Sequence, residues 1–180
     1  DLGHKYHGSR PDGISDLEWQ LRDWYGQLWL SGDVTILLSG GHSVDKMSWW
    51  LGDEMPVKAV ATGSQIFPTG GSTFDNCFVA YEYANGIYGF LGCRSQAGCY
   101  TENADHIVGT KGICTIGRAR TPVIEGEDSW RYEGPADNMY QTEHDELFAS
   151  IRSGKPINDG ARMAKTTLMA LMGRMAAYTG

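Results

Sequence analysis

The chain has 180 residues, of which 41% are hydrophobic and 21% are charged, and these ordinary values predict one globular domain with a sizeable core. The net charge of −7, without any run of Lys or Arg, argues against a nucleic-acid partner. No apolar run is long enough to span a bilayer and no signal-peptide pattern opens the chain, so no membrane partner is expected.

The first residue is Asp1 rather than Met, which indicates an excised or processed piece in which a leader or a preceding domain would not be visible. The cysteines Cys77, Cys93, Cys99 and Cys114 include no C-x-x-C pair, so a zinc knuckle is not expected. Reduced core thiols are the default prediction, although buried thiols also persist in oxidising compartments. The compartment, cytoplasmic or periplasmic, therefore stays open.

The first fifteen residues are rich in Gly, His, Pro and Asp and predict a loop. Its His4-x-x-His7 pair has no third ligand in sight, so exposed loop histidines are preferred over a metal site. Ser15-Asp16-Leu17-Glu18 resembles a capping box and predicts the start of a short helix. We expect this helix to run through Trp24 and Trp29, to bury both in the core, and to end at Ser31-Gly32-Asp33.

Gly40-Gly41 precede a second helix, predicted from His42 to Leu51. His42 and Asp45 are three residues apart and share one helix face, while Trp49 is expected to anchor the helix in the core. Imidazole exchanges protons near neutral pH, so His42 beside Asp45 forms a candidate acid/base unit. The alternatives are a satisfied structural histidine or a metal site, and the second lacks a clear third ligand.

The composition becomes β-type after the second helix, and a strand is predicted from Val57 to Phe67. Segments Phe74 to Ala84 and Ile87 to Ser95 flank Asn85-Gly86, which is the strongest short hairpin signal. We expect a two-residue turn between these segments, and this turn sets the register of the whole hairpin.

The expected register places Cys77 and Cys93 on opposite faces of the hairpin, which argues against a disulfide between them. Both faces are substantially apolar, so each should pack against another part of the protein or against a partner. Helices are expected on one face, and the aromatic face would meet another subunit or another sheet. The alternative is that helices and loops of the same chain cover both faces. The expected aromatic face carries Val79, Tyr81, Tyr83, Tyr88 and Phe90.

Further short strands are predicted at Asp105 to Val108, Ile113 to Gly117 and Val123 to Ile124, followed by an amphipathic helix from Tyr140 to Ile151. A final helix runs through Met175, and its methionines are expected in the core. His106 and His144 are taken as structural. The fold class is therefore α+β: a mostly antiparallel open β-sheet with helices packed on one face and the other face available for oligomerisation.

The chain as a whole resembles the C-terminal domain of Gfo/Idh/MocA-family oxidoreductases, the relatives of glucose–fructose oxidoreductase and inositol dehydrogenase. No single motif is decisive, but the ordered set is fairly specific and covers nearly all of the chain. The stretches that carry the resemblance are Glu18 to Trp24, Trp29 to Asp33, Gly41 to Asp45 with Trp49 to Gly52, Tyr83 to Gly86, Cys93 to Cys99, Gly109 to Gly112, Asn138 to His144 and Ile151 to Pro156.

The resemblance implies that residues 1–180 are a C-terminal substrate-binding and oligomerisation domain, with the N-terminal Rossmann domain absent from this chain. NAD or NADP would bind in the full-length parent. Nothing here resembles the Gly-rich dinucleotide fingerprint, so no cofactor is expected on this chain and the fragment alone should be inactive. The implied partners are a small carbohydrate, the Rossmann domain and further copies of the chain through the sheet.

The resemblance also implies roles for individual residues. His42 would relay the proton of the reacting hydroxyl during hydride transfer, and Asp45 would orient it or hold the helix in place. Arg94, Trp19 and Arg22 are candidates for substrate binding. Many relatives carry an acidic residue four positions before the histidine, where this chain has Leu38. That departure leaves open a non-catalytic carbohydrate-binding or assembly module, or a sugar-directed lyase or hydrolase that uses transient oxidation.

Overall fold

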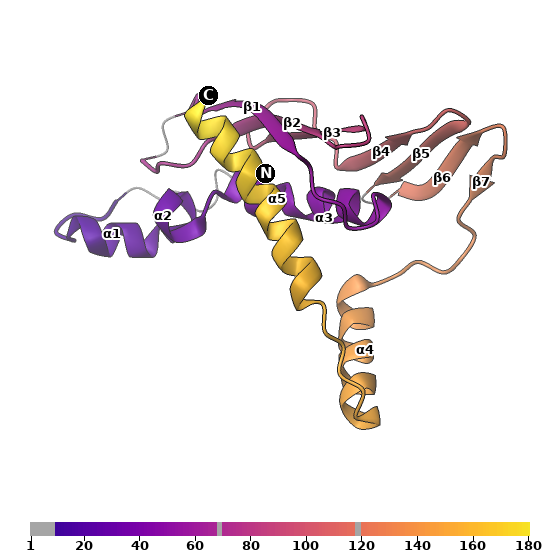
Figure 1. Cartoon of the computed structure of the whole chain (residues 1–180). Helices are drawn as coiled ribbons and strands as arrows, with labels where there is room; N and C mark the ends of the chain where they lie inside the picture. The colour runs from indigo at the N-terminus through magenta and orange to yellow at the C-terminus, as the bar shows by residue number, and fades with distance from the viewer. Residues whose placement is uncertain (1–9, 68–69, 118–119) are drawn as a thin grey trace. The chain divides into compact units, whose positions relative to one another are not determined.

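The computed structural model describes residues 10–67, 70–117 and 120–180 of the chain. His4 and His7 lie outside the described residues, so the prediction for that pair stays a prediction. The chain forms two compact units: residues up to Cys99 together with Asp159–Gly180 make the first, and Tyr100–Asn158 make the second (Figure 1).

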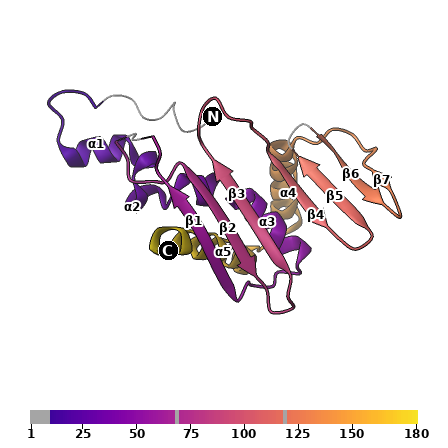
Figure 2. The same cartoon turned by 90° about the horizontal axis from the view of Figure 1, so that it is seen from above.

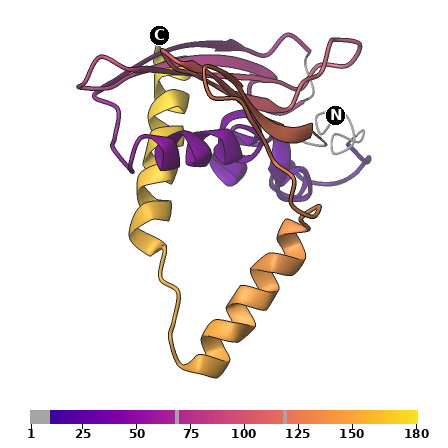
Figure 3. The ribbon, with the colours of Figure 1, turned by 90° about the vertical axis from the view of Figure 1, so that its right-hand side faces the viewer.

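The first unit is built on a three-stranded antiparallel sheet in the order β1-β2-β3. Its strands are β1 (Lys58–Ser64), β2 (Asn76–Glu82) and β3 (Tyr88–Arg94). Helices α3 (Gly41–Trp50) and α5 (Gly160–Thr179) lie on the same face of this sheet, as Figures 2 and 3 show from above and from the side. Contacts of α5 with β1 and β2, and of α3 with α5 and β3, make this face the inner face.

The core of the first unit lies between this inner face and the two helices. Tyr81 on β2 is fully buried, and its hydroxyl donates a hydrogen bond to the Met169 carbonyl at 3.1 Å. A Cβ on Gly173 would lie 2.4 Å from the Tyr81 hydroxyl oxygen, so only glycine lets α5 approach β2 this closely. The other buried members of this core are Ile36, Val44, Cys77, Val79, Tyr83, Leu91 and Ala170.

The segment before α3 is more broken than the sequence predicts. Ser15 caps α1 (Asp16–Arg22) by accepting a hydrogen bond from the Glu18 amide at 3.2 Å, which confirms the predicted start. Instead of one helix, a 3₁₀ turn (Trp24–Gly26), α2 (Leu28–Ser31) and a π-helix, η2 (Val34–Ser39), then follow.

A long-range contact explains the break. The Gly26 carbonyl accepts hydrogen bonds from the Ser72 and Thr73 amides at 2.8 and 3.2 Å, so the loop before β2 replaces the bonds of a continuing helix. The short pieces leave Trp24 and Trp29 exposed, Trp29 by 61%, so the prediction that both lie in the core is wrong.

Helix α3 begins and ends within one residue of its predicted bounds, but its buried face differs from the prediction. Val44 and Ser48, four residues apart, face the core, whereas Trp49 is 52% exposed. Trp49 therefore does not anchor the helix. The final helix shows the same difference, because Met163 and Met175 are exposed and Met169 alone among these three is buried.

The hairpin register is shifted by one residue from the predicted one. The Tyr83 amide donates to the Ile87 carbonyl at 3.0 Å and the Gly86 amide donates to the Tyr83 carbonyl at 3.0 Å, so the loop has three residues. Gly86 has φ +83°, which suits the left-handed position that closes such a loop. As a consequence Cys77 lies directly opposite Cys93 on the same face, so the prediction that these two cysteines lie on opposite faces is wrong. Both thiols are free.

The shifted register also changes which aromatic residues are exposed. Tyr81 and Tyr83 lie on the inner face, while Phe78, Tyr88 and Phe90 lie together on the opposite, outer face. Their rings stack, with centroids 6.0 Å apart for Phe78 and Phe90 and 6.3 Å apart for Tyr88 and Phe90. With Val60 these three residues form an exposed apolar face, which is called the outer aromatic face below.

The second unit holds a four-stranded antiparallel sheet in the order β4-β5-β6-β7. Its strands are β4 (Ala104–Val108), β5 (Gly112–Gly117), β6 (Arg120–Gly126) and β7 (Trp130–Arg131). Helix α4 (Met139–Ser153) starts at Asn138, whose side chain accepts from the Gln141 amide, and ends at Gly154 with φ +67°. The predicted amphipathic helix is confirmed, and its apolar positions Tyr140, Leu147, Phe148 and Ile151 are exposed.

These elements confirm the α+β class, with antiparallel strands in two open sheets and helices on one face of the first. Within the part of the chain that the structure describes, no helix combines the length and apolar character needed to cross a bilayer.

Candidate functional site

His42 is the second residue of α3, directly after the junction of the π-helix with this helix. Its side chain is exposed. Among the described residues, no hydrogen bond or ion pair of the imidazole is found. The ring nitrogens therefore have no partner among the described residues, and a proton-transfer group needs such a nitrogen.

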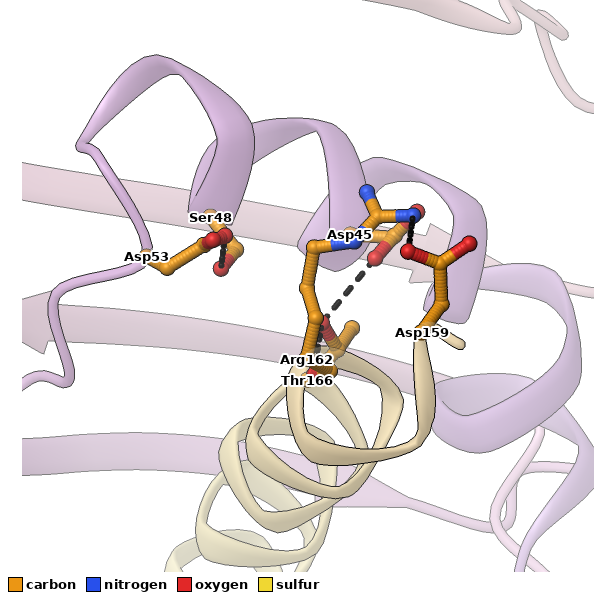
Figure 4. Close-up of polar contacts among 6 residues, drawn as sticks. All are labelled: Asp45, Ser48, Asp53, Asp159, Arg162 and Thr166. Carbon is orange, nitrogen blue, oxygen red and sulfur yellow. Dashed lines mark hydrogen bonds and ion pairs between the residues drawn. The ribbon is translucent and has the colours of Figure 1, made fainter. Parts of the chain in front are cut away.

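Asp45 lies one turn after His42 and is half-buried. Its carboxylate accepts a hydrogen bond from the Thr166 hydroxyl of α5 at 2.9 Å (Figure 4). The described contact of Asp45 is thus with the neighbouring helix and not with His42. This geometry favours the second of the two roles expected for Asp45, which is to hold α3 in place.

Further polar contacts fix the rest of α3 (Figure 4). Ser48 donates to the Asp53 carboxylate at 3.2 Å, and Asp53 takes the left-handed conformation with φ +61° just after the helix ends. On α5, Arg162 lies 3.5 Å from Asp159, and its guanidinium lies 5.1 Å from the ring centroid of Trp49. The exposed Trp49 ring is therefore held by a cation–π contact instead of by the core.

Arg94 is the last residue of β3, paired with Asn76, and it is exposed. The turn beside it is ordered by Asp75, whose carboxylate accepts from the Ile66 and Phe67 amides at 2.8 Å each. Burial alone would raise the pKa of Asp75, but the hydrogen bonds donated by Phe67, Asn76, Gln96 and Ile66 outweigh it and keep this pKa below its usual value. The Asp75 carboxylate thus stays ionised and holds the loop near Arg94.

Trp19 and Arg22 lie on α1. Trp19 is half-buried, while Arg22 is exposed and forms an ion pair with Glu18 at 2.6 Å, one turn away. Figures 1 and 2 both show α1 at one end of the first unit, beyond α2 and away from α3. The structure therefore groups His42 with Asp45 on one helix but does not bring Trp19 or Arg22 against them.

A residue that the sequence analysis treated only as a helix end proves to be central to this region. Asp33 is 0% exposed and has φ +97°, a conformation that costs a non-glycine residue about 1–3 kcal/mol. Its carboxylate caps the π-helix by accepting from the Thr35 and Ile36 amides at 2.7 and 3.0 Å. An acidic residue just before an apolar run is a helix-capping signal that could have identified it.

Within the described ranges, no group of three or more His, Cys, Asp and Glu side chains is arranged to hold a metal ion.

Comparison with known families identifies the class of protein. The model of the GFO/IDH/MocA C-terminal domain matches residues 5–115, which is more than half of the chain. The chain therefore belongs to the GFO/IDH/MocA family as a C-terminal domain, and the resemblance seen in the sequence is confirmed. No curated protein matches the chain significantly.

Solved structures show the same fold. A protein from Thermotoga maritima is 24% identical, with a TM-score of 0.69 over 96% of this chain and 50% of that one. Aldose-aldose oxidoreductase from Caulobacter crescentus is 20% identical, with a TM-score of 0.69 over 86% of this chain and 48% of that one.

The WlbA dehydrogenase from Bordetella pertussis, solved with NADH and UDP-GlcNAcA, is 18% identical, with a TM-score of 0.64 over 93% of this chain and 50% of that one. Across these three structures the chain spans about half of the relative's length. At these identities the likeness establishes the fold of the chain.

Proposed function

We propose that this chain is the substrate-binding half of an NAD(P)-dependent oxidoreductase acting on a sugar, a polyol or a related carbohydrate. The observation that carries the proposal is the exposed imidazole of His42 at the start of α3, on a domain of the GFO/IDH/MocA C-terminal type. One structurally similar protein is named as an aldose-aldose oxidoreductase, and the WlbA dehydrogenase was solved with NADH and UDP-GlcNAcA, which supports this substrate class.

We propose that this chain does not bind a dinucleotide by itself. Gly40 and Gly41 follow a π-helix rather than a strand, so they lack the strand–turn–helix context that cradles a pyrophosphate. In the full-length parent the other half of the protein would hold the nicotinamide, which would supply the hydride acceptor. This chain supplies the substrate side of the reaction.

His42 acts as the general base on that side. Its neutral imidazole takes the proton of the reacting hydroxyl as the C–O single bond becomes a carbonyl, and the resulting imidazolium returns the proton in the reverse direction. Asp45 holds α3, through Thr166, so that the imidazole keeps its position. Arg94 can donate several hydrogen bonds to a sugar hydroxyl or carboxylate. Trp19 and Arg22 lie on α1, away from α3, so we give them no contact with the reacting group.

The direct test is a substrate screen of the full-length parent against a panel of sugars, polyols and sugar acids, with nicotinamide absorbance followed. We expect turnover with at least one member of the panel and none with the 180-residue chain alone. A parent that binds nicotinamide but turns over no carbohydrate would contradict the proposal and favour the lyase, hydrolase or non-catalytic alternatives.

We also propose that copies of the chain associate through the outer aromatic face. Val60, Phe78, Tyr88 and Phe90 are all exposed on one side of the three-stranded sheet, and three of them stack on one another. Contiguous exposed apolar side chains of this kind mark interaction surfaces more often than ordinary solvent-facing ones. The same face also favours the assembly module as the second candidate function.

A further inference from the structure

Asp33 and the C-terminal helix are joined by a chain of part-buried hydrogen bonds that the proposed function does not use. The Tyr178 hydroxyl of α5 donates to the Asp33 carboxylate at 2.7 Å, and the same hydroxyl accepts from the Phe74 amide at 2.8 Å. The Tyr178 and Phe74 rings stack with centroids 3.8 Å apart and planes 5° apart. The Tyr178 side chain therefore has little freedom to leave Asp33.

Two more contacts tie the same corner together. Arg174, one turn before Tyr178, donates to the Gly32 carbonyl at 2.9 Å, and the Thr35 hydroxyl donates to the Phe74 carbonyl at 2.6 Å. The residues on both sides of Asp33 are thus held, Gly32 by α5 and Thr35 by the loop that leads into β2.

The π-helix transmits this anchoring to the candidate site. Asp33 caps its first turn, and its last bond runs from the Gly40 amide to the Thr35 carbonyl at 3.1 Å. A Cβ on Gly40 would lie 2.7 Å from the Ile36 carbonyl oxygen and 2.9 Å from the Cys93 sulfur, so this residue is closely packed on both sides. The π-helix begins directly after Asp33, and Gly40 alone separates it from α3, where His42 is the second residue.

We infer that Asp33 is a positioning residue that, through its bond to Tyr178 and the π-helix, fixes where the His42 imidazole points. The inference rests on the proposed role of His42. Asp33 is fully buried and does not touch the substrate side, so it acts only through the backbone that leads to His42. Misplacing a catalytic group by about 1 Å can cost about 10²-fold in rate, so such an anchor matters for turnover.

The test uses Asp33→Asn and Tyr178→Phe in the full-length protein. Asparagine can still cap the π-helix through its oxygen, but its amide faces the Tyr178 hydroxyl in place of an acceptor. Phenylalanine keeps the ring stack and removes the hydroxyl. We expect each variant to lower kcat by about 10–100-fold with KM for the nicotinamide unchanged, and the double variant to lose little more than either single one, because both break the same link.

Met169→Ala is the matched control, since it truncates a fully buried side chain on the same helix without touching the link. It should lower the melting temperature and leave kcat within about twofold. Single variants that remain folded and keep kcat within the same range as this control would overturn the inference.

A second readout does not depend on activity. The ring Cε1–Hε1 resonance of His42, assigned with His42→Gln, should shift in Asp33→Asn and Tyr178→Phe while those of His106 and His144 stay in place. An unmoved His42 resonance would overturn the inference, even if turnover fell. If His42→Gln itself left turnover unchanged, the proposed function would fail, whereas a resonance shift would still establish the positioning link.

Discussion

The two faces of the β1-β2-β3 sheet have similar composition but different surroundings. Val79, Tyr81 and Leu91 on the inner face are buried beneath α3 and α5, whereas Phe78, Tyr88 and Phe90 on the outer face are exposed. Strand alternation produces both faces from neighbouring residues, so apolar content alone does not tell which one forms the core. The inner face therefore forms the core of the first unit, whereas the outer face stays exposed and is the face through which we propose that copies of the chain associate.

The largest expected effect on the free energy of unfolding is a difference between two adjacent residues of β3, Leu91 and Phe90. Leu91→Ala removes a buried side chain and should lower the free energy of unfolding by about 2–5 kcal/mol. Phe90→Ala, on the exposed outer face, should change it by less than about 0.5 kcal/mol in dilute solution. Urea denaturation at low protein concentration measures both. Equal losses would mean that the outer face is also covered within one copy of the chain.

The outer aromatic face can be tested directly for association. A single charge introduced by Phe90→Glu should turn an oligomer into a monomer without unfolding it, because the charge would be buried unpaired in the interface. Sedimentation velocity across a concentration series would show this, with Leu17→Glu, which adds the same charge at an exposed apolar residue of α1, as the control. A wild-type protein that stays monomeric at high concentration would argue against association through this face.

The burial of the inner face can also be tested by the reactivity of its two cysteines, Cys77 and Cys93. Desolvation, together with the charge of Asp33, raises the pKa of Cys77 to about 11, and desolvation, Cys77 and Asp33 raise that of Cys93 to about 12. Fewer thiolates form near pH 8, so iodoacetamide should modify Cys77 about 10²-fold and Cys93 about 10³-fold more slowly than an exposed thiol. The exposed Cys99 is the internal comparison.

Mass spectrometry of native protein over a pH series would follow each thiol. The rates of Cys77 and Cys93 should rise steadily as pH approaches the raised pKa values. Rapid labelling of Cys77 at pH 8 would show that the inner face opens readily.

The smallest effect concerns the helices that cover the inner face. Thr166→Val removes the hydroxyl that bonds Asp45 and should destabilise the protein by about 1 kcal/mol. Thr167→Val is the matched control, because its exposed hydroxyl bonds only the Met163 carbonyl of its own helix. Thermal unfolding compares the two, and an equal effect would mean that the Asp45 contact adds nothing to the packing of α3 on α5.

Local signals in the sequence predicted much of the fold. The Ser15 cap, the bounds of α3 and the strand segments follow from side chains and glycines within a few residues of each element, and all are found in the structure. The hairpin register was wrong by one residue because Asn-Gly fits both a two-residue loop and a three-residue loop with Gly86 in the left-handed position.

Features set by distant contacts could not be predicted in this way. Trp29 and Trp49 were placed in the core by composition, but which face of a short helix is covered depends on elements far along the chain. Asp33 is the clearest case. A local capping signal could have identified Asp33 itself, but its partner Tyr178 lies 145 positions away and no local pattern points to Tyr178. The role of His42 stays a prediction, which rests on a histidine and an aspartate one turn apart.

The central claim is that the exposed imidazole at the start of α3 transfers the proton of the reacting hydroxyl, and replacing it tests this most directly. His42→Ala in the full-length protein should lower kcat by about 10²–10⁴-fold, while His144→Ala, which removes an exposed imidazole bonded to the Tyr140 carbonyl, should leave it unchanged. A His42→Ala enzyme that is folded, binds nicotinamide and turns over at the wild-type rate would contradict the account.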